Sequence, residues 1–195
     1  MKIINQYSEV LTKTDYDEVL RLIEMAGRIC YKSKGDKSRQ GLEKFISKLI
    51  ALGHESVLEH FSISVKFVTS RTVSHQLVRH RLASFSQESQ RYCRYENEVV
   101  FINPNVEIIP ELENIEKKYI DLLNSGVRAQ DARSILPNCT KTEFIMTANI
   151  REWRHILNLR CSKHAQPETR EIMLKLLEQL QLQYPVFFVT HQKNE

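Results

Sequence analysis

The sequence predicts a mixed α+β fold, with helices packed on a small, mainly antiparallel sheet. Amphipathic segments of helical length outnumber strand-like segments, and one segment alternates clearly between apolar and polar residues. The five glycines are too scattered to form the G-x-G-x-x-G loop of a Rossmann domain or a P-loop. A length of 195 residues indicates a single domain, 1–195.

The first elements follow from local patterns. Residues 2–8 are expected to form an opening strand, and 14–29 a helix whose acidic first turn suits the positive end of the helix dipole. Residues 38–52 place their large apolar side chains on one helical face, and Gly53 then ends the helix. Residues 61–69 alternate with period two, as in a half-buried strand.

The central elements are a short helix, a strand and a longer helix. A helix over about 71–80 is expected to lead into an arginine-rich stretch. Residues 98–103 predict a strand that Pro104 closes, and 110–125 predict a helix that Gly126 ends.

The last third of the chain is expected to be mainly helical. Residues 127–136 predict a helix stopped by Pro137, and 150–160 predict another helix. Residues 167–183 form a third, with proline in the first turn. The pattern of 141–148 fits a strand or a helix, and both remain open.

Composition excludes several classes of protein. The chain is 42% hydrophobic and 27% charged, has no apolar run of membrane-spanning length, and begins without the apolar core of a signal peptide. We therefore expect no membrane association and a cytoplasmic location. The cysteines form no C-x-x-C pair, which favours reduced thiols over a zinc ribbon or a disulfide scaffold; they are Cys30, Cys93, Cys139 and Cys161.

No metal site is expected. The segment from His54 to His60 superficially resembles H-E-x-x-H, but its histidines are six residues apart, whereas a helical zinc pair needs four. Trp153 and His155, on the 150–160 helix, are interpreted as packing residues.

The net charge of +4 is concentrated in one segment. Residues 71–94 contain five arginines, no lysine and a single acid, Glu88, and the rest of the chain is neutral overall. Arginine pairs bidentately with phosphate or carboxylate, so this segment predicts an anionic partner. A solvated basic face and a nucleic-acid contact strip, with Phe85 and Tyr92 stacking on bases, are the alternatives.

The stretch from Arg79 to Tyr92 carries the chemistry. Three consecutive residues, Arg79-His80-Arg81, bring cationic or potentially cationic groups together, and an anion would offset their repulsion. Four amide and hydroxyl side chains follow, suited to recognising a base edge and a sugar by directional hydrogen bonds; they are Ser86, Gln87, Ser89 and Gln90.

These residues resemble the flavin-dependent thymidylate synthases. In that family Arg-His-Arg is followed by seven residues and a serine, and Arg79-His80-Arg81 with Ser89 matches this spacing. Further blocks agree in order over roughly residues 20–175: Gly53-His54-Glu55-Ser56 through Glu59-His60, Gln76, Arg91-Tyr92, Ala132-Arg133 before Leu136-Pro137, Asn158-Leu159-Arg160, and His164-Ala165-Gln166 through Arg170.

The resemblance implies methylation of dUMP to dTMP. The carbon donor would be 5,10-methylenetetrahydrofolate, the redox cofactor FAD and the reductant NADPH. The family also implies a homotetramer with a non-Rossmann flavin site between subunits, no enzymic thiol nucleophile and no nucleic-acid partner. The residues agree, since side chains rather than a glycine-rich loop must hold the flavin, and cations near its N1 would tune it.

The resemblance also assigns individual residues. The FAD-binding positions are Ser56, Arg79, His80, Arg81, Gln87, Asn158 and His164, and His54 lines the flavin site. The dUMP-binding positions are Gln76, Arg79, Gln87, Glu88, Ser89, Gln90, Arg91 and Arg170. Arg170 is also the expected catalytic residue, because it matches the arginine that holds the uracil ring and stabilises negative charge at N3.

Three positions depart from the family pattern. Gln87 stands where some members carry Glu, and Gln90 where some carry Gly. Glu143 stands where some members place an arginine against the nucleotide phosphate, and a carboxylate there would repel phosphate. Arg91 or Arg133 is the expected substitute. The rival function is a nucleic-acid-binding module that uses residues 71–94 and, unlike a flavoprotein, is colourless.

Overall fold

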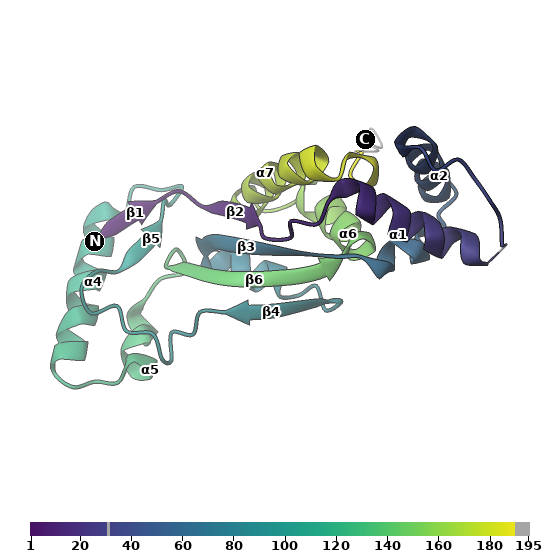
Figure 1. Ribbon diagram of the computed structural model, residues 1–195. Helices are drawn as coiled ribbons and strands as arrows, with labels where there is room; N and C mark the ends of the chain where they lie inside the picture. The colour runs from purple at the N-terminus through teal and green to yellow at the C-terminus, as the bar shows by residue number, and fades with distance from the viewer. Residues whose placement is uncertain (31, 190–195) are drawn as a thin grey trace. The chain divides into compact units, whose positions relative to one another are not determined.

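A small sheet and several helices make up the fold that the computed structural model describes for residues 1–30 and 32–189 (Figure 1). By their contacts the residues divide into two compact units. The first holds Met1–Ser8, Lys66–His80 and Phe85–Ile145. The second holds Glu9–Val65, Arg81–Ser84 and the chain from Met146 onward. The predicted α+β class is confirmed.

Four strands form the main sheet of the described residues, in the order β2, β3, β6, β4. Their bounds are Tyr7–Val10, Ser62–Ser70, Lys141–Asn149 and Ala83–Gln87. Residues 141–148, for which a strand and a helix both remained open, form a strand. This strand, β6, pairs with β3 on one side and with β4 on the other. The alternating segment 61–69 is confirmed as β3.

The central strands β3 and β6 are antiparallel. At one end of the pair the backbone N–H of Arg71 donates to the carbonyl of Thr140 at 3.1 Å, and at the other Ile150 donates to Phe61 at 3.0 Å. Residue numbers therefore rise along β3 in the direction in which they fall along β6, and this defines an antiparallel ladder. The small, mainly antiparallel sheet predicted from the sequence is therefore present.

The predicted opening strand 2–8 is wrong in one respect: it forms two strands. β1 (Lys2–Ile4) pairs in parallel with β5 (Val100–Ile102), while β2 belongs to the main sheet. Gln6 lies between them, buried, and its side-chain oxygen accepts from the Thr69 hydroxyl at 2.7 Å. The strands have different partners, so no single strand spans the segment.

The first unit adds short helices and one long helix. They are α3 (Arg71–Leu77), α4 (Ile109–Asn124), α5 (Ala129–Ala132) and the 3₁₀ helix η2 (Arg133–Ile135). The helix predicted over 71–80 therefore ends three residues early, and that predicted over 127–136 is shorter and changes type. A buried cluster packs α4 and α5 beside β5: Val99, Phe101, Leu112, Tyr119, Leu123, Ala129 and Ala132.

The second unit contains the other helices of the described residues. They are α1 (Tyr16–Ile29), α2 (Arg39–Ala51), the 3₁₀ helix η1 (Glu55–His60), α6 (Ile150–Arg160), α7 (Pro167–Gln183) and the 3₁₀ helix η3 (Pro185–Phe187). Local capping explains the starts of α1 and α2, because the side chain of Asp15 accepts from Asp17 N–H and that of Ser38 accepts from Gly41 N–H. Gly53 follows α2 with φ +74°, a conformation that favours glycine.

Helix α6 carries Trp153 and His155, the two residues that were expected to be packing residues, and it buries only one of them. Trp153 is fully buried, and its indole N–H donates to the carbonyl of Ile63 at 2.9 Å. His155 is exposed, so the packing prediction is wrong for it. Residues two apart on an α-helix point to nearly opposite faces, and only one of them can face the core.

Within residues 1–30 and 32–189, every helix is too short or too polar to cross a membrane.

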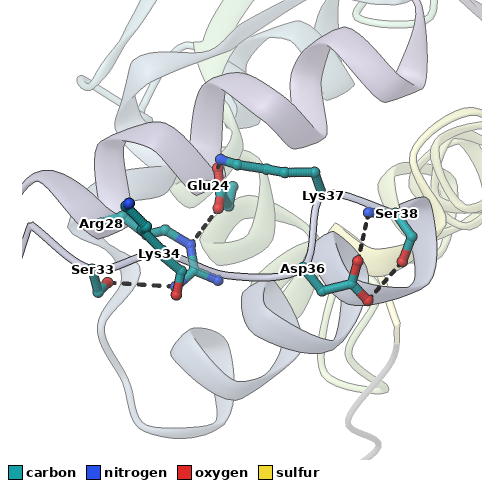
Figure 2. A network of polar contacts seen from close by, with 7 residues as sticks. All are labelled: Glu24, Arg28, Ser33, Lys34, Asp36, Lys37 and Ser38. Atoms are coloured by element: carbon teal, nitrogen blue, oxygen red, sulfur yellow. Dashed lines mark hydrogen bonds and ion pairs between the residues drawn. The ribbon is translucent and has the colours of Figure 1, made fainter.

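A buried carboxylate ties α1 to the segment that leads into α2 (Figure 2). Glu24 is 2% exposed at its side chain and pairs with Arg28 and with Lys37, the latter at 2.7 Å. Burial by itself would raise the pKa of Glu24, but hydrogen bonds from Lys37 and Arg28 outweigh it, and the pKa lies below its ordinary value of 4.5. The ionised carboxylate therefore stabilises the folded state.

Replacing Glu24 by Gln should reduce stability in a pH-dependent way. Because the folded pKa is lowered, the stabilisation is present above the unfolded pKa and is lost as pH falls through the folded pKa. We expect Glu24→Gln to cost about 1 kcal/mol at neutral pH, with the difference from wild type shrinking below pH 4.5. Urea unfolding across this range measures it. Glu171→Gln, which breaks an exposed pair with Lys175, is the control, and an equal pH dependence in both variants would contradict the prediction.

Candidate functional site

The predicted site residues occupy both units. Eight belong to the first: Gln76, Arg79, His80, Gln87, Glu88, Ser89, Gln90 and Arg91. Five belong to the second: Ser56, Arg81, Asn158, His164 and Arg170. Each unit therefore contains a part of the predicted FAD- and dUMP-binding residues.

In the first unit, Gln87 links β4 to its surroundings. Its side-chain amide donates to the hydroxyls of Ser74 on α3 and Thr142 on β6, both at 3.0 Å. Both N–H groups are used, whereas no described residue donates to the amide oxygen. Gln87 therefore offers an acceptor with a defined direction.

A tight turn follows β4 and presents the next predicted residues. The carbonyl of Ser89 accepts from the N–H groups of Tyr92 at 3.1 Å and Cys93 at 2.9 Å, and its hydroxyl accepts from Arg91 N–H at 3.3 Å. Arg91 is exposed and reaches Gln130 through Nε at 3.4 Å. The turn thus holds Ser89 and Arg91 by backbone bonds while leaving most of the guanidinium accessible.

A network of alternating charges lies beside this turn. Lys141 Nζ is 3.3 Å from Glu88 and 2.7 Å from Glu143, and Lys66 Nζ is 2.7 Å from the other oxygen of Glu143. Tyr95 donates its hydroxyl to Glu88 at 2.5 Å. Hydrogen bonds from Lys141 and Lys66 lower the pKa of Glu143. Glu143 is therefore an ionised carboxylate satisfied by two lysines.

These contacts account for the departure at Glu143. Among the described residues, the two lysines beside Glu143 both pair with carboxylates, so neither is left as an uncompensated cation for a phosphate at that position. Sequence reasoning missed Lys66 and Lys141, since their only signal was a change of charge sign at Glu143. A phosphate must find its cations elsewhere.

The first unit also contains a cavity of about 350 Å³ beside Gln90. Six polar residues line it: Arg71, His75, Gln90, Arg133, Ser134 and Asn138. Gln90 and Arg133 were singled out from the sequence, whereas Arg71 was noted only as part of the basic segment, and His75, Ser134 and Asn138 were missed. We call this cavity the arginine pocket.

In the second unit, η1 and α6 hold two predicted FAD residues in packed elements. Arg154 on α6 pairs with Glu55 on η1 at 3.0 Å, which ties the helix carrying Asn158 to the one carrying Ser56. The side chains of Ser56 and Asn158 are both exposed. Neither makes a side-chain hydrogen bond within the part of the chain that the structure describes, and the same holds for Arg81 and His164. Their donors and acceptors are available to a ligand.

Arg170 is held from one side. Its Nε donates to the carbonyl of Cys161 at 3.1 Å, across the turn between α6 and α7. No residue among 1–30 and 32–189 accepts from its two terminal amino groups. The guanidinium is thus oriented by the backbone, and its paired N–H edge remains available, as the predicted catalytic role needs.

The Cys161 thiol is unsuited to be a nucleophile. Burial raises its pKa to about 11, although the Arg170 guanidinium acts in the opposite direction. A thiol with this pKa is almost wholly protonated at neutral pH, and the thiolate is the reactive form. All four cysteines are free thiols.

One contact bears on the nucleic-acid alternative. The ring of Phe85, expected in that alternative to stack on bases, lies 6.5 Å from the ring of Phe144, which itself stacks on Phe67 at 5.0 Å. Phe85 is half-buried in this aromatic row of the sheet. Tyr92 is 73% exposed, and the Arg91 guanidinium lies over its ring, 5.3 Å from the ring centroid.

Comparison with known proteins identifies the family. The family model described as thymidylate synthase complementing protein matches residues 9–186. The flavin-dependent thymidylate synthase of Mycobacteroides abscessus is 37% identical over 86% of this chain and 77% of its own length, and that of Mycobacterium tuberculosis H37Rv is 36% identical over 90% and 80%.

The fold is also found among solved structures. The UMP/dUMP methylase PolB from Streptomyces cacaoi, bound with 5-Br dUMP, superposes with a TM-score of 0.80 at 20% identity, covering 96% of this chain and 95% of that one. At this identity the likeness concerns the fold alone. The length of the family match and the identity to the curated relatives show that this chain belongs to the flavin-dependent thymidylate synthases, the thymidylate synthase complementing protein family of enzymes.

Proposed function

We propose that this chain methylates dUMP to dTMP, with 5,10-methylenetetrahydrofolate as carbon donor, FAD as cofactor and NADPH as reductant. The observation that carries the proposal is the Arg79–Ser89 motif in a chain that belongs to this family, followed by a turn in which Arg91 is ordered and accessible. The curated relatives bear the name flavin-dependent thymidylate synthase, and the PolB structure holds a brominated dUMP.

The donor set is chemically suited to FAD. Ser56, Asn158, His164 and Arg81 offer a hydroxyl, an amide, an imidazole and a guanidinium without internal partners among the described residues. A flavin dinucleotide needs hydrogen bonds to its rings and cations at its diphosphate, and these groups can supply both. Arg79, His80 and Gln87 complete the proposed FAD set. When bound, FAD supplies the redox chemistry that carries electrons from NADPH to the transferred one-carbon group.

The chain's own residues would bind and polarise dUMP. Gln87 presents its amide oxygen as an acceptor, while Ser89, Gln90 and Arg91 present donors from the turn; Gln76, Arg79 and Glu88 are the other proposed contacts. Arg170 would face the uracil ring and stabilise negative charge that develops at N3 as C5 attacks the methylene carbon. A permanent cation is suited to this role because it needs no proton transfer.

The proposed function is tested by purifying the protein, recording its visible absorbance spectrum and assaying the formation of dTMP. We expect the full chain to copurify with a visible flavin spectrum and to form dTMP only when dUMP, NADPH and the folate are all present. Light scattering should give a homotetramer. Colourless protein that makes no dTMP after FAD is added, and that binds DNA with a steep salt dependence, would instead support the nucleic-acid-binding module.

Removing all four thiols should separate stability from activity. Cys93, Cys139 and Cys161 are half-buried, so a variant with every cysteine replaced by Ser should melt several degrees lower. Turnover of dUMP should persist, because no thiol is assigned to the reaction. Steady-state dTMP formation and a thermal melt measure the two effects. Loss of turnover in a folded, flavin-loaded variant would refute thiol-independent catalysis.

A further inference from the structure

The 3₁₀ helix η1, which carries Ser56 of the proposed FAD set, has little stability of its own. It is six residues long, and 3₁₀ runs longer than about four residues are uncommon because their hydrogen-bond geometry is poor. Within the described part of the chain, His54 precedes η1 without a side-chain cap, and Leu58 is the one buried residue of η1. Tertiary contacts must therefore hold η1 in place.

Helix α6 binds η1 through two arginines. Arg154 donates from Nε and Nη2 to one oxygen of Glu55, Oε1, at 3.3 and 3.0 Å. Arg151 donates from Nη1 to Glu59 at 2.5 Å. Spacings of three and four residues put Asn158 on the same face of α6 as both arginines. The face of α6 that carries one proposed flavin donor therefore also binds the element that carries another, Ser56.

Of these two ion pairs, the pair made by Arg154 is the better shielded from water. The side chains of Arg154 and Glu55 are 15% and 26% exposed, whereas those of Arg151 and Glu59 are 53% and 46% exposed. An exposed ion pair contributes little because water and salt screen it. Removing one partner of a shielded pair leaves the other charge without compensation. Arg154 therefore has the larger part in holding η1 against α6.

Arg154 also binds a third element. Its Nη1 donates to the backbone carbonyl of Phe187, at the end of η3. Each of the three guanidinium nitrogens thus donates within the protein, and the planar fork is fixed in one orientation. Arg81 and Arg170 differ, because their guanidinium groups keep donors available to a ligand. Arg154 can therefore act on a cofactor only through the elements that it holds.

We propose that Arg154 is a positioning residue for the FAD cofactor. It holds Glu55, and with it the adjacent Ser56, against α6. The Ser56 hydroxyl and the Asn158 amide then keep a fixed spacing before the cofactor arrives, which lowers the cost of ordering them on binding. The inference rests on the proposed function, because both donors belong to the proposed FAD set.

Titration of the full-length, flavin-free protein with FAD, followed by flavin fluorescence, tests this role. Arg154→Gln should raise the dissociation constant of FAD about tenfold or more, because a charge-assisted contact that fixes one donor is lost. Arg154→Lys should restore part of the affinity, since it keeps the charge but lacks the fork that reaches Glu55 and Phe187 together. Adding Glu55→Gln to Arg154→Gln should weaken binding no further, because both changes break the same contact.

Arg151→Gln is the matched control, because it removes the same charge from the same face of α6 and breaks the exposed pair. It should leave the affinity for FAD within about twofold. An unchanged affinity in Arg154→Gln, or an equal loss in Arg151→Gln, would overturn the proposal. If Arg154→Gln fails to fold, Glu55→Gln decides: weaker FAD binding than in Arg151→Gln supports the role, and equal binding overturns it.

Amide hydrogen exchange separates this proposal from the proposed function. In the flavin-free protein, Arg154→Gln should speed exchange in η1, Glu55–His60, whereas Arg151→Gln should leave it close to wild type. Unchanged exchange in η1 of Arg154→Gln would overturn the positioning role even if FAD binds normally. A wild-type chain that neither binds FAD nor forms dTMP would reject the proposed function, and exchange would then decide separately whether Arg154 holds η1.

Discussion

Replacing Arg170 by Ala should slow dTMP formation by roughly 10²–10³, the loss expected when one electrostatic donor to a developing charge is removed. The guanidinium is oriented by the Cys161 carbonyl, and its terminal amino groups have no acceptor among the described residues, so they can act on a substrate. Flavin reduction by NADPH should be affected less, because no charge develops on uracil in that half-reaction.

The two half-reactions can be timed separately for Arg170. Stopped-flow absorbance follows flavin reduction, and quenched samples from prereduced enzyme with dUMP and the folate follow dTMP. Arg170→Lys should rescue partly, since it retains the charge but loses the planar fork. Arg151→Ala is the control, because Arg151 is exposed on α6 and pairs with Glu59. Equal slowing of both half-reactions by Arg170→Ala, or no slowing, would show that Arg170 does not activate uracil.

Arg81→Ala should release flavin while leaving the fold intact. Arg81 is exposed and has no side-chain partner within the described residues, so its removal breaks no internal contact. A charge-assisted hydrogen bond to the cofactor is worth about 1.5–3 kcal/mol, which corresponds to about a 10- to 150-fold rise in the dissociation constant of FAD. Arg79→Ala should act in the same direction, on flavin or on nucleotide.

Flavin absorbance after gel filtration, read together with a thermal melt, measures this effect. Arg94→Ala is the matched control from the same basic segment, because Arg94 is exposed and pairs with Glu96 at 2.6 Å. Full flavin occupancy and normal turnover of Arg81→Ala would remove Arg81 from the proposed cofactor site.

Local interactions made most helices readable from the sequence. Side chains of Asp15 and Ser38 cap α1 and α2, and the helix predicted over 167–183 has the observed bounds of α7. A cap acts within a few residues of the helix that it starts, so its signal is present in a short window. The Arg79–Ser89 spacing was likewise readable, and with it the family.

Strands and the partners of charged groups depended on tertiary structure. The segment 83–87 is only five residues long, and Ala83 and Phe85 are the two apolar residues of its half-buried face; it became β4 because β6 lies beside it. Residues 2–8 divided because β5 and β3 each supplied a ladder. A strand's hydrogen bonds are completed by residues far along the chain, which no local window contains.

The same reason explains the site. The sequence by itself determined the family, the basic segment and the identity of its donors. Only the tertiary structure decided that Lys66 and Lys141 neutralise Glu143, and that Arg71, Gln90 and Arg133 line one pocket. Electrostatic interactions depend on distance in space, and these side chains come from segments up to 77 residues apart in the chain.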